Sequence, residues 1–265
     1  MRIADLGRWL FAATFIGIGL SGLISGDFGA IWQPVAKTWP GREALIYACA
    51  LVALGAGLGM LWRRTAAPAA GVLGAWLLLW ILVFKARFVL ATPLSAVVWE
   101  SSGETTVQLA AAWVVFAGLA VGGRPGAFSF ATGERGLRIA RALYGLSMIA
   151  FGAAHFAFAK QTASLVPGWL PSHMVWVWLT GSTYIVAGVA ILLGALARLA
   201  AALSAVQIGL FTLLVWAPTV AAGAASRAQW SEAVVSWALT VSAAVVAASY
   251  AGAPWLISGR RRRFG

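Results

Sequence analysis

Eight apolar runs, each close to the length of a membrane-spanning helix, dominate the sequence. They are Leu6–Ile24, Ala44–Trp62, Ala66–Val89, Thr106–Val121, Leu137–Ala159, Met174–Leu193, Leu199–Trp216 and Ala233–Tyr250. A helix needs about 20 residues to cross the hydrocarbon core of a bilayer, and the runs lack the alternation typical of membrane strands. We therefore predict an all-α, polytopic membrane protein with eight transmembrane helices.

The composition agrees with a membrane protein. Hydrophobic residues make up 62% of the 265 residues and charged residues only 10%, whereas about a quarter of the residues of soluble domains are charged. The 15 Trp suit the membrane interface, where an indole ring has one apolar and one wet edge. The net charge of +12 comes from bases at the ends of the runs, so it predicts contact with membrane lipids and no nucleic-acid partner.

The distribution of Lys and Arg predicts the orientation. Of the 19 bases, 13 lie at the termini and in the even-numbered loops, and six lie in the odd-numbered loops. Because basic loops stay on the cytoplasmic side, we expect both termini in the cytoplasm of a bacterial cell, with the protein in the inner membrane. The first run follows two arginines, as in a signal peptide, but no small-residue cleavage site follows it, so we expect a retained helix.

The two halves of the chain resemble each other. Arg8, Leu10, Gly19 and Pro34 recur 133 residues later as Arg141, Leu143, Gly152 and Pro167, and the offset is 131 between Gly57 and Gly188. We therefore predict two tandem four-helix bundles, residues 1–122 and 137–251, with a linker at 123–136 and a basic tail at 252–265. Four helices per half place both repeats in the same orientation, as in several transporter families. The turns Asp27–Arg42 and Lys160–Ser172 are expected to fold against the mouths of these bundles.

Few polar residues are candidates for a site inside the membrane. His155 lies near the end of the fifth run, where it is either a functional residue or a neutral histidine bonded to a backbone carbonyl or water. A metal or haem shared with His173 has no supporting motif. Lys85 and Arg87 either extend to water or form a cationic rim for an anion or a quinone carbonyl.

The acidic residues and the single cysteine limit which kinds of transport and cofactor binding the sequence supports. None of the seven acidic residues falls in the middle of a predicted span, which argues against a proton-coupled pump. Glu104 and Glu232 are expected at the starts of the fourth and eighth helices, where a carboxylate stabilises a helix N-terminus. Cys49 is alone, so no thiolate-bound or covalent cofactor is expected. Arg260, Arg261, Arg262 and Arg263 are expected to anchor the tail to anionic lipid.

The segment Phe151–Leu193 resembles the DoxX-like family of small four-helix membrane proteins. The resemblance rests on Gly152, His155, Phe156, Val166, Pro167, Trp169, Leu170, Pro171, Thr180, Gly181 and Gly188. Many relatives carry a Glu at the position of Tyr184, so a role that depends on that acid does not transfer. Some members look like membrane subunits of thiosulfate:quinone oxidoreductase, which implies a quinone as ligand and a partner redox subunit.

Three functions remain open from the sequence. The first is a quinone- or electron-transfer-associated membrane component, with His155, Trp169, Lys85, Arg87 and Tyr184 near the ligand. The second is a small-solute transporter or channel built from parallel repeats. The third is a structural or assembly subunit without a ligand of its own. A dry, aromatic-lined pocket open to lipid would favour the quinone-associated component. A polar path between the halves would favour the transporter or channel, and a bundle without a cavity would favour the structural subunit.

Overall fold

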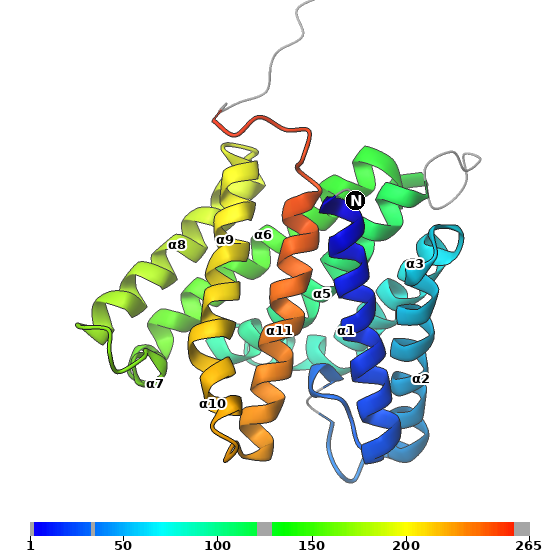
Figure 1. The fold of residues 1–265 in the computed structure, drawn as a ribbon, viewed down its shortest axis with the longest axis horizontal. Helices are drawn as coiled ribbons and strands as arrows, with labels where there is room; N and C mark the ends of the chain where they lie inside the picture. The colour runs from blue at the N-terminus through cyan, green and yellow to red at the C-terminus, as the bar shows by residue number, and fades with distance from the viewer. Residues whose placement is uncertain (1–2, 33–34, 121–128, 257–265) are drawn as a thin grey trace, which may run out of the picture.

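The computed structural model describes residues 3–32, 35–120 and 129–256, and all regular structure in these ranges is helical. Figure 1 shows the helices packed side by side. In chain order they are α1 (Ile3–Ser25), η1 (Ala30–Trp32), α2 (Arg42–Leu61), α3 (Arg63–Trp80), η2 (Ile81–Lys85), α4 (Ala86–Ala91), α5 (Ala96–Leu119), η3 (Ser129–Ala131), α6 (Gly133–Ala157), α7 (Ala159–Leu165), α8 (His173–Leu193), α9 (Ala197–Phe211), η4 (Thr212–Trp216), α10 (Ala217–Ala221) and α11 (Arg227–Ala248).

Seven helical segments in the described residues are long and apolar enough to cross a membrane. They comprise α1, α2, the continuous segment Arg63–Ala91, α6, α8, the continuous segment Ala197–Ala221 and α11. The chain is therefore a multi-pass membrane protein. The eighth expected span falls in α5, which has 24 residues but carries polar residues along its first half. Because α5 packs against α3, α6 and α11, much of it is surrounded by other helices.

Two of the long segments change from α-helix to π-helix partway along. The π-helical segment η2 follows α3, and η4 follows α9. A π-helical turn contains an extra residue, so it changes the direction in which the following side chains point. Lys85, at the end of η2, reaches Ser101 on α5, and Thr212, at the start of η4, hydrogen-bonds Ser236 on α11. Each π segment therefore brings a polar side chain to the helix beside it.

Glycines allow two pairs of helices to approach closely. A Cβ atom at Gly57 on α2 would lie 2.8 Å from the backbone nitrogen of Ile16 on α1. A Cβ atom at Gly188 on α8 would lie 2.5 Å from the carbonyl oxygen of Gly145 on α6. These distances are shorter than van der Waals contact, so only glycine fits at either crossing. Close backbone contact of this kind stabilises helix pairs in membranes, where the lipid is as apolar as the side chains.

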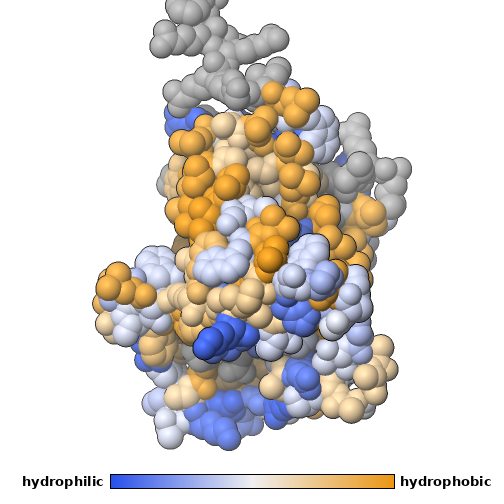
Figure 2. All heavy atoms as spheres, turned by 90° about the vertical axis from the view of Figure 1, so that its left-hand side faces the viewer, coloured by the Kyte–Doolittle hydropathy of each residue, from blue (hydrophilic) through white to orange (hydrophobic). Residues whose placement is uncertain are grey.

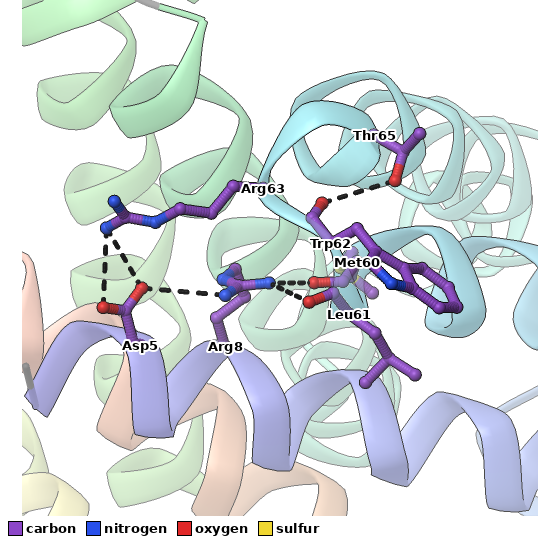
Figure 3. A network of polar contacts seen from close by, with 7 residues as sticks. All are labelled: Asp5, Arg8, Met60, Leu61, Trp62, Arg63 and Thr65. Atoms are coloured by element: carbon purple, nitrogen blue, oxygen red, sulfur yellow. Dashed lines mark hydrogen bonds and ion pairs between the residues drawn. The ribbon is translucent and has the colours of Figure 1, made fainter. Parts of the chain in front are cut away.

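A buried arginine fastens the turn between α2 and α3. Arg8 donates from Nη1 to the carbonyl oxygens of Met60 and Leu61, at the end of α2, and forms an ion pair with Asp5 (Figure 3). The last carbonyl groups of a helix have no partner within the helix, so the guanidinium of Arg8 satisfies two of them. Arg63 also reaches Asp5, but its side chain is exposed.

The interior of the first half is filled by aromatic side chains. Phe28 and Trp32, from the loop after α1, are buried, and both rings contact Trp80 on α3, with ring centroids 5.7 and 5.3 Å apart. Phe84 also packs against Trp80, with ring centroids 4.3 Å apart. The expectation that the Asp27–Arg42 turn folds against the bundle is therefore confirmed for Phe28 and Trp32.

The Lys160–Ser172 loop does not bury its Trp side chain in the way that the loop after α1 does. Residues Ala159–Leu165 form the short helix α7, and the Trp169 side chain that follows is 71% exposed. The prediction that the Lys160–Ser172 turn covers its bundle in the same way is therefore wrong for Trp169. The predicted linker also ends earlier than expected, because α6 already begins at Gly133; residues 121–128 lie outside the described ranges.

Candidate functional site: an apolar groove beside an acidic chamber

A groove of about 680 Å³ opens between α8 and α9. Its walls are mostly aliphatic and aromatic, and they include Leu165, Val166, Trp169, Trp176, Leu179, Val186, Ala187, Ala190, Leu203, Leu210, Phe211 and Leu214. Several of these side chains are also exposed on the outer surface, including Val186 and Leu203. Figure 2 shows the side of the molecule that carries α7 and α8, where hydrophobic residues cover the upper part and hydrophilic residues gather toward the lower end. In a bilayer, such a groove faces acyl chains.

A short row of polar groups crosses the wall of the groove. Thr183 on α8 donates to the side-chain oxygen of Gln207 on α9 at 2.6 Å, and Gln207 donates to the carbonyl oxygen of Thr180 at 3.0 Å. Deeper in the bundle, the hydroxyls of Tyr144 and Ser204 lie 2.9 Å apart. Polar groups at fixed positions in an apolar site orient the head group of a ligand.

His155 lies at the inner end of the groove. Its Nδ1 is 2.8 Å from the carbonyl oxygen of Phe151, one turn earlier on α6. If Nδ1 carries the proton of the neutral ring and donates it to this carbonyl, Nε2 remains an acceptor. The ring also contacts Tyr184 edge-on, with centroids 5.3 Å apart. Both hypotheses for His155 therefore fit the structure. Its ring contacts a backbone carbonyl group, and the same side chain lines the groove.

A second cavity, the acidic chamber, adjoins the groove. It measures about 270 Å³ and is lined by residues of α5, α6, α7, α8, α9, η4 and α11. Its polar lining consists of Glu100, Glu104, His155, Gln161, Thr162, Tyr184, Glu232 and Ser236. The groove and the chamber share His155, Thr162, Leu165, Tyr184 and Phe211. His155 and Tyr184 therefore stand at the boundary between an apolar and an acidic space.

The three carboxylates of the chamber are not helix caps. Glu104 lies eight residues after the start of α5, and the capping box of α11 is formed by Ser226 and Gln229. Capping is therefore the wrong explanation for Glu104 and Glu232. The five ion pairs among the described residues involve other acids, Asp5, Asp27 and Glu134, so none of them neutralises a carboxylate of the chamber.

Lys85 is a buried cation on η2, which packs against α5. Its side chain is only 4% exposed, and the ammonium donates to the Ser101 carbonyl oxygen at 2.6 Å and to the Ser101 hydroxyl at 2.8 Å. It also interacts electrostatically with Glu104. The prediction that Lys85 extends to water is therefore wrong, because η2 directs it toward α5. Lys85 lines neither the chamber nor the groove.

The remaining expected site residues separate into different environments. Trp169 and Tyr184 line the groove, whereas Arg87 packs its guanidinium over the rings of Trp39 and Phe88 in the first half. The four arginines Arg260, Arg261, Arg262 and Arg263 lie outside the described residues. No group of three or more His, Cys, Asp or Glu in the described ranges has a geometry suited to a metal ion.

Sequence reasoning did not anticipate Glu100 and Gln207 as site residues. Gln207 lies in an apolar helix and Glu100 in the polar half of α5, and a polar residue within a membrane helix is a signal of a functional position. That signal was present in the sequence. What the sequence does not contain is the packing of α5 against α6 and α11, which brings acids from different helices to one cavity.

No family model, curated protein or solved structure matches this chain.

Proposed function

We propose that the protein is a membrane component that binds an amphipathic ring ligand of the quinone class in the groove between α8 and α9. The observation that carries this proposal is a mostly apolar cavity of about 680 Å³, bordered by lipid-facing side chains and crossed by a polar row at Thr183 and Gln207. An apolar tail suits the aliphatic walls, and a carbonyl-bearing head suits fixed donors and acceptors. The protein contributes position and polarity, and the redox groups belong to the ligand and to a partner redox subunit.

The direct test is stabilisation by a short-chain quinone. We expect decylubiquinone to raise the thermal unfolding midpoint of the protein in a mild detergent, because a ligand that binds only the folded state stabilises it. Ala190→Phe places a ring in the groove and should abolish the shift. Leu51→Phe, at an exposed position on α2, is the matched control and should retain it. Equal shifts in the wild type and both variants would reject the groove as the site.

A small-solute transporter is the second candidate. The acidic chamber favours it, because α5 of the first half and α6 and α11 of the second half enclose this polar cavity together. Intramembrane carboxylates commonly mark solute or proton pathways. Uptake of a cationic solute into proteoliposomes, abolished by Glu104→Gln, would support this candidate over the first. The third candidate, a ligand-free structural subunit, gains no support from a bundle that contains two cavities.

We also propose that the chain arose by duplication of a four-helix unit that gives eight spans, with α5 as the fourth. Three observations support this proposal. The π segments η2 and η4 begin 131 residues apart, at Ile81 and Thr212. The glycine crossings at Gly57 and Gly188 are also 131 apart, and their contacts at Ile16 and Ile149 are 133 apart, as expected for the first helix of each repeat. The resemblance of Phe151–Leu193 to the DoxX-like family fits a unit of this size.

For the cellular location we propose the inner membrane of a bacterium, with both termini in the cytoplasm. The start of α1 and the end of α11 lie at the same end of the molecule (Figure 1), which supports termini on one side. Fusion of a reporter that is active only in the cytoplasm should give a signal at either terminus. A signal at both termini from a second reporter, active only in the periplasm, would contradict the proposed orientation.

A further inference from the structure

We propose that the acidic chamber is a binding site for a small organic ammonium ion. This site goes beyond the quinone groove, since it is built on the carboxylates of α5 and α11 and not on the polar row between α8 and α9. Three different features of the chamber lead to this ligand class: an excess of negative charge, aromatic walls, and carboxylates that are spread over the cavity.

The charge balance of the chamber is opposite to that of the whole chain. The protein has seven acidic residues against 19 Lys and Arg, yet Glu100, Glu104 and Glu232 line one cavity that contains no Lys or Arg in its lining. The carboxylates repel one another, and Lys85, which attracts Glu104 but is not part of the lining, donates its hydrogen bonds to Ser101. Carboxylates that share one cavity are stabilised by a cationic partner, and no Lys or Arg among the described residues lines the chamber.

Aromatic rings form much of the remaining wall. They are Phe151, Phe158, Tyr184, Phe211 and Trp216, which come from α6, α8, α9 and η4, with Phe158 between α6 and α7. The faces of aromatic rings attract cations, and cavities that combine several rings are typical of sites for ammonium groups with alkyl substituents. An apolar ligand would leave the carboxylates unpaired, whereas an anion would be repelled by them.

The spacing of the carboxylates disfavours a metal ion. Hard metal cations require several oxygen ligands that converge on one point, and no group of three or more candidate ligands in the described residues converges in that way. Carboxylates distributed over the wall of a 270 Å³ cavity fit a larger ion whose charge is spread over a bulky head group.

Two of the lining residues connect the chamber to the outside of the bundle. Gln161 and Glu232 line the cavity and are also exposed on the surface. A ligand can therefore reach the carboxylates without opening the helix packing.

The test compares choline with its neutral isostere, 3,3-dimethyl-1-butanol, by isothermal titration into the purified protein. Choline should bind and the isostere should not, because the two molecules have the same shape but only choline carries a positive charge. Glu104→Gln and Glu232→Gln should each weaken choline binding about tenfold. Phe158→Leu should weaken it by a smaller factor, because it removes one ring from the wall.

Glu134→Gln is the matched control, since Glu134 pairs with Arg141 on α6 and does not line the chamber. This variant should bind choline as the wild type does. Equal binding of choline and the neutral isostere, or unchanged choline binding in folded Glu104→Gln protein, would overturn the proposal. Competition by sodium or potassium at the same concentration as choline would also overturn it, in favour of an inorganic cation site. None of these results depends on quinone binding to the groove.

Discussion

At the scale of single residues, buried cations in this protein are held by backbone carbonyl groups. Arg8 donates to the carbonyls that end α2, and Lys85 donates to the carbonyl of Ser101. A sequence reading assigns both to the water interface, because long basic side chains near helix ends usually extend there. The direction of Lys85 depends on the π-helical turn before it, and no local pattern in the sequence predicted that turn.

Arg8 provides a test at this scale. Arg8→Ala should lower the free energy of unfolding by about 2 kcal/mol, because it leaves two carbonyl groups at the end of α2 without a charged donor. Arg63→Ala is the control, since its exposed ion pair with Asp5 is worth about 0–1 kcal/mol. Unfolding curves in detergent measure both changes. If Arg63→Ala lowers the free energy of unfolding as much as Arg8→Ala does, the contact of Arg8 with the carbonyl groups at the end of α2 has no special importance.

At the scale of elements, the sequence predicts the membrane helices well and their interruptions poorly. Seven expected spans are confirmed as long apolar helices, and residues 106–119 of the fourth run form the C-terminal part of a longer helix, α5. The sequence predicts that this span starts after Glu104, because the apolar run begins there. In the structure α5 extends through Glu100 and Glu104, because surrounding helices replace lipid around its polar half. Packing therefore decided where this helix begins.

The α1–α2 crossing gives a prediction for these elements. Gly57→Ala should destabilise the protein by about 1–3 kcal/mol, because the added methyl group meets the backbone of Ala12 and Ile16. Gly55→Ala, on the same helix, has nothing within 4 Å of the added atom and should be neutral or slightly stabilising. The difference between the two unfolding midpoints is the measurement. Identical midpoints would mean that the helices are not in close contact at Gly57.

At the scale of the whole molecule, the two halves differ in how their interiors are filled. Aromatic residues from the loop after α1 fill the first half, whereas α7 and Trp169 leave a groove in the second. The sequence pointed to the second half through His155 and the Phe151–Leu193 resemblance. It did not predict the difference between the loops, because loop placement depends on contacts with residues that are distant in the chain.

Asp27 connects the first and second halves of the chain. Its carboxylate accepts from Arg42 at the start of α2 at 2.5 Å and from Arg227 at the start of α11 at 2.6 Å. Burial alone would raise the pKa of Asp27, but the N–H of Phe28 and the two guanidinium groups outweigh it, so the pKa lies below its ordinary value. A carboxyl with a lowered pKa stabilises the fold above its unfolded pKa of about 3.9, and the effect disappears as the pH falls through the native pKa.

Asp27→Asn should therefore be less stable than the wild type at neutral pH, and the difference should shrink as the pH falls below about 4. Thermal unfolding in detergent between neutral and acidic pH measures this difference. A gap between the two proteins that stays constant over that range would contradict the role of the charged carboxylate.

The groove in the second half is the central claim, and photolabelling tests it most directly. A quinone with a photoreactive diazirine in its tail, activated in membranes that contain the protein, should modify peptides of α8 and α9 that include Thr183, Val186 and Gln207. Excess decylubiquinone should suppress this labelling. Labelling spread evenly over the lipid-facing surfaces of α1, α2 and α3, or labelling that decylubiquinone does not suppress, would contradict a specific site between α8 and α9.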